Sequence, residues 1–97
     1  MHVSVRFFGS LRALVEKKME CVKFEDSDET TVEKVLKRLS EIHGKDFVEY
    51  VFDERTGEIQ SRLLLLVNGR SITVLGGFET TLTDDDVLAI LPPVGGG

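Results

Sequence analysis

The sequence predicts an α+β fold in which a mixed sheet of about five strands packs on one main helix. Apolar residues recur at helical spacing in one long segment, residues 30–44, while shorter segments on either side alternate or run apolar as strands do. A chain of 97 residues can build one two-layer core. We therefore expect one domain over residues 1–94, followed by a flexible glycine tail at 95–97.

The first two strands are predicted at residues 3–8 and 20–25. Apolar and polar residues alternate along the first strand, and its parity puts Phe8 on the face away from the helix. The residues expected to face the helix are Val3, Val5 and Phe7. Gly9 ends this strand, and residues 10–15 are expected to form a short helical turn before the second strand.

The main helix has clear start and stop signals. Thr30, followed three residues later by Glu33, predicts a capping box. Glu33 and Lys37 are spaced to pair on the outer face, and Gly44 supplies the stop. The stripe expected to cover the sheet consists of Val32, Val35, Leu36, Leu39 and Ile42.

Two further segments precede the last strand. Residues 46–61 are interpreted as a loop that can contain a short helix, with a turn at 53–57. Strands at 62–67 and 71–74 are predicted to form a tight hairpin, because the Asn68-Gly69 pair between them accommodates positive φ angles.

The last strand is predicted at residues 87–91, with Leu88 and Ile90 toward the helix and Leu91 away from it. Pro92-Pro93 then ends the strand, because proline cannot donate to a sheet. An order of strand, strand, helix, strand, short strand and strand is typical of the β-grasp, or ubiquitin-like, fold.

The charge balance limits the class of partner. Seventeen Asp and Glu residues against 12 Lys and Arg give a net charge of −5, which argues against nucleic acid and favours basic partners. No apolar stretch approaches the ~20 residues of a membrane helix, and the first residues lack the layout of a signal peptide. We therefore expect a cytoplasmic protein that does not bind membranes.

Few side chains suggest catalysis. Cys21 is expected to be a small buried hydrophobe, with sulfur chemistry as the alternative, because no neighbouring His or Cys activates its thiol. His2 and His43 make no metal-ligand spacing, and residues 84–86 are expected to form a solvated acidic turn. We expect no bound metal or cofactor and no autonomous enzyme.

The tail offers different chemistry. Gly95, Gly96 and Gly97 have no side chains to add to a core, so the group they present is the α-carboxylate of Gly97. Such a tail is thin enough to enter a narrow enzyme channel. The alternative is a frayed C-terminus without a role.

Six short motifs are spread over nearly the whole chain: Val5-Arg6-Phe7-Phe8-Gly9-Ser10-Leu11-Arg12, Thr31-Val32, Val67-Asn68-Gly69, Leu75-Gly76-Gly77-Phe78, Leu82-Thr83-Asp84 and Pro92-Pro93-Val94-x-Gly96-Gly97. With them the chain resembles the MoaD family, the small sulfur-carrier subunits of molybdopterin synthase, and the related small archaeal modifier proteins. Three positions depart from the family pattern. The family often has an acidic residue where this chain has Ala13, Gly where it has Asp85, and Phe where it has Leu91.

The resemblance implies a carrier. A ubiquitin-activating-type enzyme would use ATP to adenylate the Gly97 carboxylate, and a sulfur donor would convert the adenylate to a thiocarboxylate. The large subunit of molybdopterin synthase would then receive the sulfur. The alternatives are conjugation of Gly97 to lysines of target proteins, a thiamine-type sulfur carrier, and an interaction module with an unreactive tail.

A partner surface is expected around the base of the tail. Phe8 and Leu91 share the face away from the helix, and apolar patches of this kind mark interfaces, unless segment 46–61 folds over them. Arg12 is expected either to contact a partner carboxylate or to be a solvated surface residue. The predicted partner-binding set is completed by Pro92, Pro93 and Val94.

Overall fold

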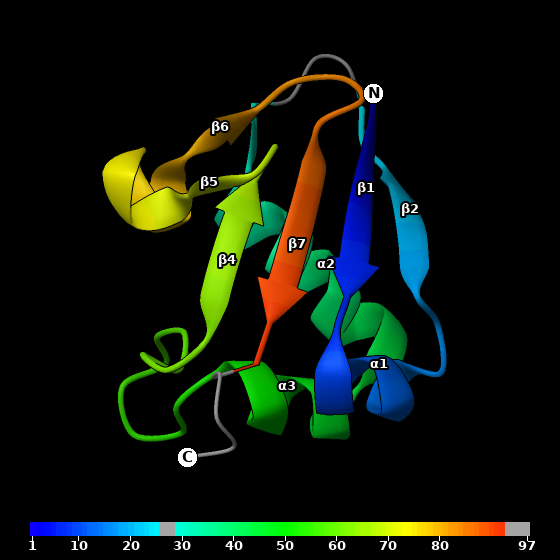
Figure 1. Cartoon of the computed structure of the whole chain (residues 1–97), viewed down its shortest axis with the longest axis vertical. Helices are drawn as coiled ribbons and strands as arrows, with labels where there is room; N and C mark the ends of the chain where they lie inside the picture. Colours follow the sequence, from blue (N-terminus) through cyan, green and yellow to red (C-terminus); the bar gives the residue numbers. More distant parts are fainter. Residues whose placement is uncertain (26–28, 93–97) are drawn as a thin grey trace.

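The computed structural model describes residues 1–25 and 29–92, which form a five-stranded sheet with helices behind it and at one end (Figure 1). The strands are β1 (His2–Phe7), β2 (Met19–Lys23), β3 (Thr30–Thr31), β4 (Leu64–Val67), β5 (Arg70–Ser71), β6 (Thr81–Leu82) and β7 (Val87–Leu91). The helices are α1 (Gly9–Val15), α2 (Val32–His43) and α3 (Lys45–Val51), with 3₁₀ turns η1 (Ile72–Val74) and η2 (Gly77–Glu79).

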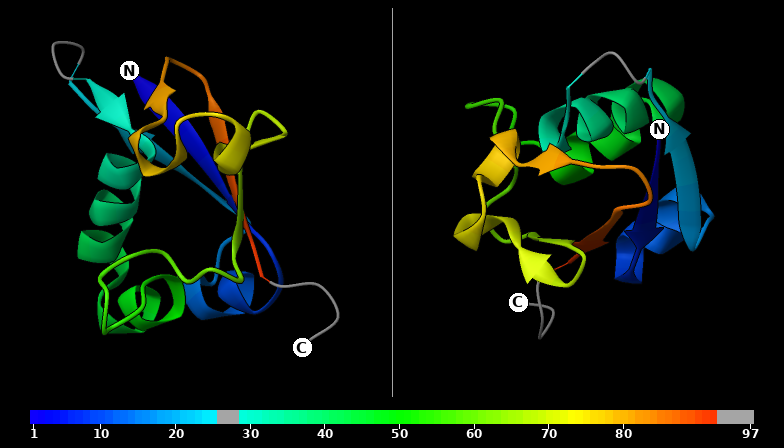
Figure 2. Two further views of the ribbon diagram at one scale, coloured as in Figure 1. Left: turned by 90° about the vertical axis from the view of Figure 1, so that its left-hand side faces the viewer. Right: turned by 90° about the horizontal axis from the view of Figure 1, so that it is seen from above.

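The first and last strands lie side by side in the sheet. β1 pairs antiparallel with β2 and parallel with β7. β7 pairs antiparallel with β4, which pairs with β5, so the order is β2-β1-β7-β4-β5. A separate two-stranded ladder joins β3 to β6. The predicted mixed sheet on one main helix is confirmed, and Figure 2 shows α2 along one face of it.

The core lies between the sheet and α2. Its fully buried members include Val3, Val5, Phe7, Val32, Val35, Leu36, Leu39, Leu88 and Ile90. The predicted inward faces of the first strand, the last strand and the helix are thus confirmed, except at Ile42, which is 50% exposed. At this end of α2 the ring of His43 packs against Phe7 and Phe47, and it takes the place expected for Ile42.

The main helix begins one residue later than predicted. Thr31 is its N-cap, and its hydroxyl accepts from the backbone N–H of Lys34 at 3.3 Å. Thr30 instead pairs with Leu82 in the β3–β6 ladder, where it is buried. The predicted capping box of Thr30 and Glu33 is therefore wrong. A capping box needs its Glu three residues after the N-cap, and Glu33 lies only two residues after Thr31. The pairing of Glu33 with Lys37 is confirmed at 3.9 Å.

The predicted hairpin is present with a shorter second strand. Asn68 and Gly69 have φ angles of 49° and 84°, as the Asn-Gly signal requires. The second strand ends at Ser71, whose hydroxyl accepts from the N–H of Thr73 at 3.2 Å and caps η1. The strand predicted over residues 71–74 is therefore mostly a 3₁₀ turn.

Segment 46–61 contains a short helix, in agreement with the prediction of a loop that can hold one. α3 covers Lys45–Val51, and the predicted turn follows it, with the N–H of Gly57 donating to the carbonyl of Asp53 at 2.8 Å. Both α3 and this turn lie at the end of the sheet rather than across it (Figure 2).

The acidic turn before β7 is more than a solvated loop. Asp84 accepts from the N–H of His2 at 2.7 Å, which ties the turn to the start of β1. Asp85 has a φ of 69°, in the left-handed region that favours glycine. This geometry explains why the resembling family often has Gly here, and Asp is among the residues that tolerate it best.

Asp86 joins this turn to the β4–β5 hairpin. Its Oδ1 accepts from Asn68 Nδ2 at 2.9 Å, and its Oδ2 accepts from the N–H of Thr83 at 2.8 Å. Partial burial by itself raises the pKa of Asp86, but the hydrogen bonds from Thr83 and Asn68 outweigh this effect and hold the pKa below its usual value of 3.8.

We expect Asp86→Ala to lower the free energy of unfolding at pH 7 by about 1 to 2 kcal/mol, because hydrogen bonds to a charged acceptor are lost. A carboxylate whose pKa is lowered by folding stabilises the fold above its unfolded pKa and stops doing so as pH falls through the folded value. The stability gap between wild type and Asp86→Asn should therefore close as pH falls below 3.8. Urea unfolding measures this gap, with the exposed Glu54→Gln as control; a gap that persists in acid contradicts the prediction.

Candidate functional site

The sheet face opposite α2 is free of helices in the described part of the chain (Figure 2). Its outward side chains, assigned from the strand registers, are His2, Ser4, Arg6, Met19, Cys21, Lys23, Leu64, Leu66, Ser71, Val87, Ala89 and Leu91. We call this set the open face. On β4 and β7 it consists of aliphatic side chains only, which is typical of a protein-binding surface.

The structure places Phe8 and Leu91 at the end of the open face from which the chain leaves the sheet. Leu91 is the register partner of Leu64, and Phe8 lies beside Arg6, whose guanidinium carbon is 6.0 Å from the ring centre. Both residues are half-buried. The α3 part of segment 46–61 packs elsewhere: it contacts α1 and α2, and the hydroxyl of Tyr50 hydrogen-bonds that of Ser10 at 2.5 Å.

Two of the most exposed apolar side chains on this face were missed by the sequence reasoning. Met19 is 56% exposed and Leu64 is 42% exposed. Residues 63–66 are four successive leucines, so their pattern has no alternation that assigns a face. Only the pairing of Leu64 with Leu91 places it outward.

The residue that follows β7 is held in place by a close contact. Gly9 has a φ of 58°, and a Cβ atom built on it would lie 2.6 Å from Cγ of Pro92. Only glycine leaves room for the proline ring at this distance. Pro92 therefore lies against the junction of β1 and α1. The other predicted tail residues, Pro93, Val94 and Gly95–Gly97, lie outside the described residues.

The prediction that Cys21 is buried is wrong. Cys21 is exposed, because β2 is an edge strand and its register pairs Cys21 with Ser4 on the open face. The neighbouring Val22 takes the inward position and is 3% exposed. Arg12 is exposed on α1 and makes no ion pair with any described residue, so its predicted role as a partner contact stays a prediction.

His43, which the sequence presented as isolated, has a partner in the fold. Its Nε2 lies 2.6 Å from Oε1 of Glu20, and both side chains are nearly buried. This pair joins the end of α2 to β2.

The part of the chain that the structure describes has no group of three His, Cys, Asp or Glu side chains that could hold a metal ion. None of its helices has the length and apolar character of a membrane span.

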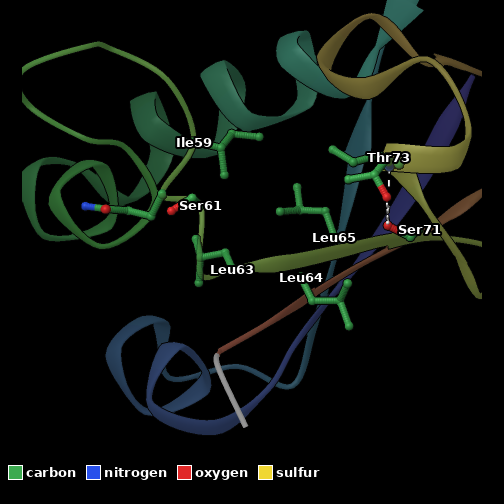
Figure 3. A pocket seen from close by; sticks show the side chains of 9 residues that line it. Ile59, Ser61, Leu63, Leu64, Leu65, Ser71 and Thr73 are labelled. Carbon is green, nitrogen blue, oxygen red and sulfur yellow. Dashed lines mark hydrogen bonds between the residues drawn. The ribbon is translucent and has the colours of Figure 1, made fainter. Parts of the chain in front are cut away.

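A small hollow of about 170 Å³ lies beside the open face at the β4–β5 edge (Figure 3). Apolar and hydroxyl side chains line it, including Ile59, Leu63, Leu64, Leu65, Ser71 and Thr73. Leu64 and Ser71 belong both to this lining and to the open face. The hollow thus continues the uncharged β4–β7 part of the open face around the edge of the sheet.

The order of the mixed sheet and the main helix packed on it define a small ubiquitin-like protein of the β-grasp class. The chain belongs to the ThiS family, whose model matches residues 5–97. It is 32% identical over 97 residues to Small archaeal modifier protein 3 of Haloferax volcanii, and the alignment covers 100% of both chains.

Two further similarities support the same class. A candidate sulfur carrier protein of Archaeoglobus fulgidus is 35% identical over 72 residues, covering 74% of this chain and 80% of that protein. The structure of a candidate molybdopterin converting factor subunit 1 from Pyrococcus furiosus has a TM-score of 0.75 and 26% identity, covering 97% of this chain and 99% of that one. The predicted family and fold are confirmed: the protein is a sulfur carrier or ubiquitin-like modifier of this family and not itself an enzyme.

We expect Gly9→Ala to displace Pro92, because the new methyl group overlaps the proline ring and the residue must keep a positive φ. The free energy of unfolding should fall by about 2 to 4 kcal/mol. Gly57→Ala is the matched control, since Gly57 also has a positive φ but nothing lies within 4 Å of its added Cβ. Chemical denaturation compares the two variants. Equal losses in the free energy of unfolding would show that the contact of Gly9 with Pro92 does not contribute to the effect.

Proposed function

We propose that this protein is a sulfur carrier whose Gly97 carboxylate is adenylated and converted to a thiocarboxylate that supplies sulfur for molybdopterin. The observation that carries the proposal is the path of the chain. β7 leaves the sheet at the end of the open face, with Pro92 against Gly9, just before the glycine-rich terminal residues. An enzyme bound to the open face would therefore receive the tail beside its own docking surface.

The proposed chemistry needs activation, because a carboxylate oxygen is a poor leaving group. An oxygen of the Gly97 carboxylate attacks the α-phosphate of ATP, pyrophosphate leaves, and an acyl-adenylate forms. A sulfide-class donor then attacks the acyl carbon and AMP leaves, so that sulfur replaces one oxygen. We assign the ATP site and the sulfur donor to partner proteins in the cytoplasm; this chain contributes the carboxylate and the docking face.

Two partners follow from this scheme. The first is a ubiquitin-activating-type enzyme that adenylates the tail, and the second is the large subunit of molybdopterin synthase that receives the sulfur. The similarity to the candidate sulfur carrier of Archaeoglobus fulgidus and to the candidate molybdopterin converting factor subunit of Pyrococcus furiosus supports this choice. We assign the docking surface to Phe8, Leu91, Arg12 and Pro92, with Pro93 and Val94 in the approach to the tail.

A second function is favoured by the full-length similarity to Small archaeal modifier protein 3. The same adenylate can transfer its acyl group to a lysine amine, which forms an isopeptide bond between Gly97 and a target protein. The products separate the two functions: a thiocarboxylate on the free chain indicates sulfur transfer, and a covalent adduct with a second protein indicates modification.

Deleting Gly97, or adding one residue after it, should abolish adenylation while the melting temperature stays within about 2 °C of wild type, because the tail adds little to the core. The test is intact mass after incubation with the host's activating enzyme, ATP and sulfide. Wild type should gain about 16 Da as sulfur replaces oxygen. Full conversion of the extended variant would contradict the assignment of the Gly97 carboxylate as the reactive group.

Truncation of the docking surface should weaken partner binding. Phe8→Ala and Leu91→Ala are each expected to reduce affinity for the activating enzyme by about 1 to 3 kcal/mol, with a smaller loss of stability, since both side chains are half-buried. Val48→Ala is the matched control, because Val48 is 38% exposed but lies on α3. Titration calorimetry that finds equal affinities for all four proteins would place the docking surface elsewhere.

A further inference from the structure

The charge of the open face is opposite in sign to the charge of the chain. The whole sequence has 17 acidic and 12 basic residues. The outward strand positions, all of them within the described residues, hold Arg6 and Lys23 and not one Asp or Glu. Asp84, in the turn before β7, lies beside this face, with its Oδ1 3.9 Å from Nδ1 of His2, but His2 begins β1 and is thus at the far end of that strand from Phe8.

Arg6 is the charged residue within the apolar part of this face. In the sheet it lies between Met19 of β2 and Ala89 of β7, its two register partners. Its guanidinium lies over the ring of Phe8, with the charged carbon 6.0 Å from the ring centre. Arg6 is exposed and forms no salt bridge with any residue in the described part of the chain.

A protein that covers the apolar surface must also cover Arg6. Removing water from a guanidinium without supplying an acceptor is strongly unfavourable, so a stable complex must offer acceptors there, and a carboxylate is the acceptor that also balances the charge. A planar guanidinium suits two parallel hydrogen bonds to one carboxylate, and the apolar surroundings strengthen them by excluding water. Arginines set among apolar groups are also frequent hot spots of interfaces.

A second copy of this chain fits the face poorly. In a two-fold contact through the open face, the open face of one copy lies against the open face of the other. Because the outward strand positions hold no Asp or Glu, such a contact places no strand carboxylate opposite Arg6. Two chains of net charge −5 also repel each other. We propose that the adenylating partner docks on the open face and places an Asp or Glu carboxylate against Arg6, which makes Arg6 a specificity residue of the complex. This inference rests on the proposed function.

The test is the dissociation constant for the host's purified activating enzyme, measured by calorimetry. Arg6→Gln should raise it by about tenfold or more, and Arg6→Lys by less, because lysine keeps the charge but not the paired hydrogen bonds. Arg55→Gln is the matched control: it changes the net charge equally, and Arg55 lies in the turn after α3. It should stay within about twofold of wild type.

A second measurement locates the partner. Cys21 is the chain's only cysteine and is exposed on the open face, so bound enzyme should slow its alkylation by iodoacetamide, as read from intact mass. Equal effects of Arg6→Gln and Arg55→Gln, or unchanged alkylation of Cys21 in the complex, would overturn this inference while wild-type thiocarboxylate formation still supports the proposed function. Failure of wild type to bind or react would overturn both.

Discussion

The parallel pairing of β1 with β7 is the constraint on which the rest of the structure depends. It joins the first and last strands, so the register of Phe7 with Ile90 leads directly to the contact of Gly9 with Pro92. Closing so long a loop costs chain entropy, which the burial of apolar side chains from both strands against α2 offsets. The pairing therefore determines both the core and the point at which the chain leaves the sheet.

The two faces of the sheet divide stability from recognition. Inward side chains such as Val5 and Leu88 are fully buried and leave little freedom for substitution. Outward side chains such as Leu64 and Met19 retain large exposed areas, so their removal affects the core much less. The open face is thus built on the sheet without being part of the core.

The distribution of charge also depends on the fold. A net charge of −5 indicates, from composition alone, that basic surfaces attract the chain. Among the described residues, the fold brings Arg6 and Lys23 to the open face, whereas Glu20 lies on the inward side of β2 and pairs with His43. Overall charge governs long-range approach, whereas the local charge of the face selects what it binds.

Periodicity predicted the main helix and the inward faces of the first and last strands, because it is a local property, and the Asn68-Gly69 turn needs only its own residues. The family motifs likewise identified the class of protein. The tertiary contacts were needed to show that Thr31 caps the main helix, that Cys21 is exposed and that Leu64 faces outward on the open face. Each of these depends on which strand pairs with which and in what register, and that is set by contacts between residues far apart in the chain.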